Sequence, residues 1–236
     1  MKALNNQTRT SATLALAAVA ATLAVGIMQA QAQSVEYTFS DGTSDGWADS
    51  GFSATPVATV STIGSQNYAY IPYVGFQSGN VGTGYAGNLT GFDAAMAAAL
   101  NNPSAYDLSY TYYINTATFS GATFLQLGTF LNAGSGYYSQ DYSTPNEVQF
   151  TGAQLSSGQV FTGTVTINMG SVFSSDSSAA TETFYRLGLI ENTDSTATGV
   201  GVYYTDISVT PVPEPGTLVL AGLGGLSMLF LRRRKA

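Results

Sequence analysis

Between residues 33 and 210, short runs rich in Tyr, Phe, Val and Thr alternate with turn residues. Gly, Asn, Asp and Ser interrupt the chain about every 8–12 residues, a spacing typical of all-β sandwiches and barrels. The pattern predicts strands at Val35–Phe39, Thr55–Ser61, Tyr68–Tyr73, Ser109–Asn115, Thr123–Leu131, Glu147–Thr151, Val160–Asn168, Phe184–Glu191 and Gly201–Thr210.

Large and small positions alternate within Phe184–Ile190. The face formed by Tyr185, Leu187 and Leu189 is therefore expected to point into a core. The Ala-rich segment Phe92–Leu100 predicts a helix, which Asn101-Asn102-Pro103 ends. We therefore expect an all-β fold, an antiparallel β-sandwich of jelly-roll type with one short helix.

An apolar run, Ala12–Ile27, lies near the N-terminus and follows the basic residues Lys2 and Arg9. The small residues Ala30 and Ala32 then provide a cleavage site for signal peptidase. We expect residues 1–32 to be a helical signal peptide cut after Ala32. A permanent membrane anchor is the alternative, but the run is short and Ala-rich for one.

The C-terminal segment, residues 211–236, has three parts in a fixed order. Val212-Pro213-Glu214-Pro215 resists helix formation, Thr217–Leu231 is uncharged and mostly apolar, and Arg232-Arg233-Arg234-Lys235 follows. Fifteen helical residues cover about 22 Å, less than the ~30 Å of a hydrocarbon core. The segment predicts a transmembrane-like helix whose basic end stays in the cytoplasm.

This C-terminal segment resembles the PEP-CTERM sorting signal of Gram-negative bacteria, on its tetrapeptide Val212-Pro213-Glu214-Pro215, the apolar helix and the terminal basic cluster. The resemblance implies recognition by an exosortase and cleavage near the motif. It also implies a transient stay in the inner membrane, delivery to the cell surface or extracellular matrix, and a link to exopolysaccharide and biofilm. Residues 33–210 would then be the extracytoplasmic domain.

Charge and composition exclude several functions. From Gln33 to Leu231, Arg186 is the only basic residue against all 14 acidic ones, a balance of −13. Such a body lacks the basic surface that nucleic-acid binding requires. The chain has no Cys and no His, which excludes disulfides, thiolate chemistry, His-assisted catalysis and Cys/His zinc sites.

Both ends of the body resemble jelly-roll carbohydrate-binding modules, on Tyr37–Trp47 with its Asp-Gly turn and Trp, and on the closing run Tyr203–Val209. The resemblance implies that these ends pair as neighbouring strands. It also implies a structural calcium ion near that seam, held by Asp206 and Asp41. The segment Asp41–Gly46 has the spacing with which an EF-hand loop begins, but the twelfth position is Phe52 and not the Glu that an EF-hand needs. A tight turn is therefore the alternative interpretation of this segment.

Aromatic and acidic side chains offer two further chemistries. Tyr137, Tyr138 and Tyr142, in a Gly/Ser-flanked segment expected to be an exposed loop, could stack on sugar rings. Trp47 is expected in the core instead. A glycosidase would need a pair of acids about 5–9.5 Å apart, for which the strand acids are the candidates: Glu147, Glu182 and Glu191.

The sequence therefore predicts an exported, non-enzymatic surface or matrix protein without a required cofactor, whose partners are signal peptidase and an exosortase. The first alternative is a carbohydrate-binding module that recognises a matrix glycan such as exopolysaccharide. The second alternative is a glycoside hydrolase.

Overall fold

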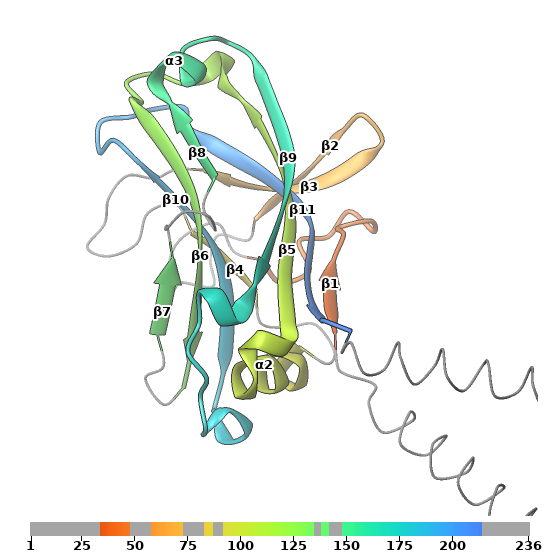
Figure 1. The fold of residues 1–236 in the computed structure, drawn as a ribbon. Coiled ribbons are helices and arrows are strands. Elements are labelled where there is room, and N and C mark those ends of the chain that lie inside the picture. Colours follow the sequence, from red (N-terminus) through yellow and green to blue (C-terminus); the bar gives the residue numbers. More distant parts are fainter. Residues whose placement is uncertain are drawn as a thin grey trace, which may run out of the picture. The chain divides into compact units, whose positions relative to one another are not determined.

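The computed structural model describes residues 34–47, 58–72, 83–86, 92–134, 138–141 and 148–213 (Figure 1). The chain divides into two compact units, Met1–Ala32 and Gln33–Ala236, and every described residue belongs to the second. The predicted signal helix with Ala30 and Ala32, and the apolar segment Thr217–Leu231, lie outside the described residues. No helix in the described ranges is long and apolar enough to cross a membrane.

Six antiparallel strands form the first sheet, sheet A. Its order is β2-β3-β11-β5-β9, and β1 pairs with β11 (Figure 1). The bounds are β1 Val35–Tyr37, β2 Thr59–Ile63, β3 Gln66–Pro72, β5 Tyr106–Asn115, β9 Val160–Asn168 and β11 Gly201–Pro211.

Five antiparallel strands form the second sheet, sheet B. Its order is β4-β10-β6-β7, and β8 pairs with β6. The bounds are β4 Thr83–Ala86, β6 Phe124–Ala133, β7 Tyr138–Asp141, β8 Val148–Thr151 and β10 Tyr185–Thr193.

Short helices connect the strands. The longest, α2, spans Phe92–Asn101 and buries one side of its surface: Phe92, Ala95, Met96, Ala99 and Leu100. The four-residue α3, Gly152–Leu155, begins at Thr151, whose side chain and that of Gln154 form a reciprocal capping box. The described connections also contain four 3₁₀ turns: η1 Pro103–Ala105, η2 Thr116–Thr118, η3 Met169–Ser171 and η4 Ala179–Thr181.

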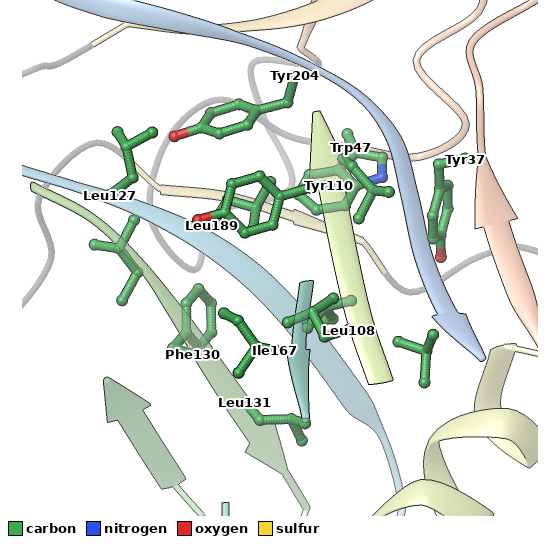
Figure 2. Packing of buried hydrophobic residues seen from close by; sticks show 14 of the residues in the cluster. Tyr37, Trp47, Leu108, Tyr110, Leu127, Phe130, Leu131, Ile167, Leu189 and Tyr204 are labelled. Atoms are coloured by element: carbon green, nitrogen blue, oxygen red, sulfur yellow. The ribbon is translucent and has the colours of Figure 1, made fainter. Parts of the chain in front are cut away.

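Apolar side chains from the two sheets pack into one core (Figure 2). Sheet A contributes Leu108 and Ile167, and sheet B contributes Leu127 and Leu189. Trp47 is fully buried and meets the ring of Tyr37 edge-on, with centroids 5.6 Å apart. The predicted core position of Trp47 is thus confirmed.

The two ends of the body pair as predicted, since Tyr37 of β1 lies opposite Ile207 of β11. The register of β11 against β5 shifts between Thr205 and Ser208. Asp206 lies in this bulge with a φ of 49°, in the left-handed region. Figure 1 shows β1 beside this C-terminal strand.

The predicted all-β antiparallel sandwich is confirmed. The strand Val160–Asn168 has the predicted bounds, and the inward positions Tyr185, Leu187 and Leu189 are buried. The sequence predicted neither β4 nor β7, each of which is four residues long.

Candidate functional site

The structure changes the setting of the predicted loop tyrosines. Tyr138 does not lie in a loop but begins the short strand β7, opposite Asn132 of β6. The pairing with β6 provides backbone hydrogen bonds that a Gly/Ser-flanked sequence alone does not reveal. Tyr137 and Tyr142 lie outside the described residues.

Asp41 forms the turn that its sequence predicts. Its Oδ1 accepts hydrogen bonds from the backbone N and the Oγ1 of Thr43, both at 2.8 Å. These bonds, the backbone one first, lower the pKa of the Asp41 carboxyl. Asp206 accepts a hydrogen bond from Nε2 of Gln66 at 3.2 Å. Within the described ranges, no three His, Cys, Asp or Glu side chains gather as metal ligands.

A calcium ion held by Asp41 and Asp206 stays a prediction. An ion that binds only the native state at 100 times its Kd stabilises that state by ~2.7 kcal/mol. For a domain of this size, chelation would then lower the melting temperature by about 5–10 °C. Calorimetry with and without chelator checks this, and Asp206→Asn should reproduce the shift. Superimposable melting curves would discard the ion.

Glu191, one of the predicted acid candidates, lies between the sheets and not on the surface. Its carboxyl is fully buried, and neither oxygen has a hydrogen-bond partner of normal geometry among the described residues. Burial raises the pKa of this carboxyl well above its ordinary value, and the nearby Val202 amide opposes the shift only in part. The half-buried Glu182 comes just before β10, and Glu147 lies outside the described residues.

Two tyrosines share this buried environment. The rings of Tyr110 and Tyr204 meet edge-on with centroids 5.8 Å apart, and their hydroxyl ends point the same way in Figure 2. Neither hydroxyl has a hydrogen-bond partner among the described residues. Burial raises the pKa of Tyr204, and Glu191 and Tyr110 raise it further. The interior therefore holds a small polar cluster that is closed to solvent.

The outer face of sheet B carries a different set of polar residues. Along β6 and β10 the positions that face the other sheet are apolar or threonine apart from Glu191. The alternate positions face the opposite way, and of these Phe130 and Ile190 are buried, whereas the polar ones are half-buried. Carboxamides and one guanidinium stand at these polar positions and at one on β8. We call this set the amide face: Gln126, Asn132, Gln149, Arg186 and Asn192.

Strand register brings the members of the amide face together. Gln149, Gln126 and Asn192 lie side by side on β8, β6 and β10. Nδ2 of Asn192 donates a hydrogen bond to Oε1 of Gln126 at 2.7 Å. Asn132 lies opposite Arg186 on β10 and opposite Tyr138 on β7. All five amide-face side chains are half-buried or exposed.

Between these two rows the sheet carries buried apolar residues, since Phe130 and Ile190 are 1% and 3% exposed. A Cβ at Gly188 would come 1.6 Å from Cε1 of Phe130, so the Phe130 ring lies directly over Gly188. Arg186 is held nearby, with its guanidinium carbon 5.0 Å from the centre of the Phe184 ring. Gly188 thus leaves room for an aromatic ring that separates the Gln126–Asn192 pair from the Asn132–Arg186 pair.

The amide face can form many hydrogen bonds to a neutral polar ligand. A carboxamide both donates and accepts, and a guanidinium offers several donors in a fixed plane. None of these five residues is a carboxylate, although residues 33–210 contain 13 acidic residues against one basic residue. Such groups match sugar hydroxyls, which also donate and accept. Alternation along β10 could have revealed Arg186 and Asn192, but only the fold shows that Gln126 and Asn132 lie opposite them.

The sandwich ends where the C-terminal motif begins. The backbone N of Val212 donates to the carbonyl of Ala105 at 2.8 Å, and Pro213 is exposed. Glu214 and Pro215 lie outside the described residues. Val212 is therefore the last described residue with a backbone hydrogen bond to the sandwich.

Comparison with known families bears on this C-terminal segment. Residues 211–235 match the PEP-CTERM protein-sorting motif. The tetrapeptide Val212-Pro213-Glu214-Pro215 lies inside that match. The chain thus carries a PEP-CTERM sorting motif. No curated protein matches the chain.

Several solved structures similar to the chain are carbohydrate-binding modules. One is a family 28 module specific for non-crystalline cellulose, with TM-score 0.47, 15% identity and coverage of 72% of this chain and 90% of that one. Another is the family 22 C-terminal module of Clostridium thermocellum Xyn10B, with TM-score 0.45, 13% identity and coverage of 77% and 96%. A third is CBM27-1 of Caldicellulosiruptor saccharolyticus in complex with mannohexaose, with TM-score 0.43, 11% identity and coverage of 76% and 97%.

Proposed function

We propose that this protein is an exported, non-enzymatic surface or matrix protein that binds a neutral glycan on the amide face. The PEP-CTERM motif indicates export and sorting to the cell surface, and it implies processing by an exosortase. The observation that carries the binding proposal is the acid-free array of amides and one arginine on sheet B, in a body that is otherwise acidic.

Charge selects the class of glycan. With a balance of −13 between Gln33 and Leu231, the body repels acidic polysaccharide at low salt, and ions screen this repulsion only beyond about 10 Å at 0.1 M. A neutral glycan meets no such repulsion. Hydrogen bonds from Asn132, Arg186 and the Gln126–Asn192 pair to ring hydroxyls would orient it.

Calorimetric titration with neutral hexasaccharides tests the proposal, with mannohexaose, xylohexaose and cello-oligosaccharide as probes. Asn132→Ala and Asn192→Ala should each weaken binding about tenfold, because each removes a donor and an acceptor worth about 1 kcal/mol or more together. Gln159→Ala is the matched control, since Gln159 is an exposed carboxamide outside the amide face.

The control variant should bind like the unaltered protein. Equal affinity in all three variants would show that the amide face is not the binding site. Tighter binding of an acidic than of a neutral hexasaccharide in chelator would overturn the argument from charge.

A further inference from the structure

Four tyrosines gather on the outer face of sheet A. Tyr70, Tyr203 and Tyr113 lie at one register position on the neighbouring strands β3, β11 and β5. Tyr70 and Tyr203 have ring centroids 4.6 Å apart, and Tyr203 and Tyr113 have centroids 5.9 Å apart. Tyr68 continues the group at 6.0 Å from Tyr113. We call these four residues the tyrosine row.

The rings of the tyrosine row do not fill the core. Each is half-buried, whereas the alternate residues Ala69, Val202 and Tyr204 are completely buried. Cross-strand aromatic pairs do stabilise a sheet, but four adjacent rings on a solvent-facing surface also form an apolar platform. The apolar faces of sugar rings pack on such platforms.

A glycine sets the shape of this platform. A Cβ at Gly201 would come 2.3 Å from the hydroxyl oxygen of Tyr70, so the Tyr70 ring lies across the backbone of β11. The planes of Tyr70 and Tyr203 are only 39° apart, whereas Tyr113 stands at 79° to Tyr203. The rings of Tyr70 and Tyr203 thus stack partly against each other, and the ring of Tyr113 meets that of Tyr203 edge-on.

Hydroxyl groups border the platform. On the β9 side, the Oγ1 atoms of Thr111 and Thr164 are 3.0 Å apart, and Oγ of Ser109 lies 3.1 Å from Oγ1 of Thr166. At the other end, the carboxylate of Asp206 lies near Tyr68, whose pKa is raised by burial first and by Asp206 second. This setting favours a neutral, hydroxyl-rich ligand and disfavours an anion.

We propose that the tyrosine row is a second glycan-binding surface and that one molecule therefore bridges two neutral glycan chains. The outer faces of sheets A and B point away from each other across the core, so two separate chains can be held at once. The bridging part of this inference rests on the proposed function of the amide face, whereas the tyrosine row can bind a glycan by itself.

The test is the stoichiometry of binding to the chain from Gln33 onwards, which forms one compact unit. Mannohexaose and xylohexaose are the probes. The unaltered protein should bind two hexasaccharides, and Tyr203→Thr should bind one, with affinity at the lost site reduced about tenfold or more. Ser208→Ala, on the same strand and face beyond the bulge, is the matched control and should bind two.

If Tyr203→Thr does not fold, Gly201→Ala tests the same surface. The added methyl group displaces the Tyr70 ring and leaves all four tyrosines in place. Because it bridges two glycan chains, the unaltered protein should also raise the turbidity or viscosity of a solution of a long neutral polysaccharide. Neither Tyr203→Thr nor Gly201→Ala should do so.

Each outcome separates the two proposals. A single site that only Asn132→Ala removes would overturn the tyrosine row and leave the amide face in place. A single site that only Tyr203→Thr removes would overturn the proposed function and the bridging, but not the tyrosine row. No binding of neutral glycan at all would overturn both.

Discussion

With Pro213, Glu214 and Pro215 all replaced by alanine, we expect the protein to stay in the membrane fraction with Arg232–Lys235 still attached. The change removes the motif that matches the PEP-CTERM signal while leaving the sandwich intact, because Val212 is the last described residue bonded to it. Surface material should fall to a few per cent of the normal amount or less. Fractionation followed by mass spectrometry of the C-terminus measures this.

Thr210→Ala is the control for this experiment, since Thr210 is exposed and lies one residue before the matched segment. It should be sorted and cut normally. An intact Arg232–Lys235 tail on the unaltered surface protein would contradict the sorting account.

Replacing Glu191 by glutamine is expected to make the protein more stable at neutral pH. The folded state holds this carboxyl without a hydrogen-bond partner of normal geometry among the described residues, and burial raises its pKa well above the ~4.3 of an unfolded chain. The native state therefore binds more protons than the unfolded state above pH ~4.3. Its free energy of unfolding should fall as pH rises toward the folded pKa, by at most about 1.4 kcal/mol per pH unit.

The opposite sign applies to Asp41, Asp176 and Asp194, whose pKa values are lowered by hydrogen bonds. The contribution of these three carboxylates to the free energy of unfolding is lost only as pH falls below about 4. Among the described groups whose pKa is shifted, Glu191 should thus dominate the slope between pH 5 and 8. Urea unfolding across this range measures it.

Glu191→Gln should flatten the pH dependence, and Glu36→Gln, at an exposed position on β1, should leave it unchanged. An equal slope in the unaltered protein and Glu191→Gln would show that this carboxyl is hydrated or paired in solution.

Local patterns in the sequence were enough to predict most strands. Val160–Asn168 could be placed because threonine occupies every second position from Thr162 to Thr166 and turn residues precede the run. Two strands could not be placed. Thr83–Ala86 (β4) pairs with β10, which lies about 100 residues later, and Tyr138–Asp141 (β7) has the mostly polar sequence Tyr-Ser-Gln-Asp although it pairs with the adjacent β6. Their stability comes from the pairing and not from their own residues.

The candidate site was harder to predict for the same reason. Continuing the alternation Tyr185, Leu187, Leu189 by one step places Glu191 inside, so its burial could have been predicted. The amide face and the tyrosine row could not have been predicted from the sequence. Both depend on registers between strands far apart in the chain, such as Asn192 with Gln126 and Tyr203 with Tyr70.

The most direct test of the glycan-binding account is a nuclear magnetic resonance titration of the chain from Gln33 onwards with a neutral hexasaccharide. The account predicts that the largest chemical-shift changes fall on the side-chain amides of Gln126, Asn132 and Asn192, with a separate group on β11 around Tyr203. A spectrum unchanged at saturating hexasaccharide, or changes confined to residues on neither outer face, would contradict it.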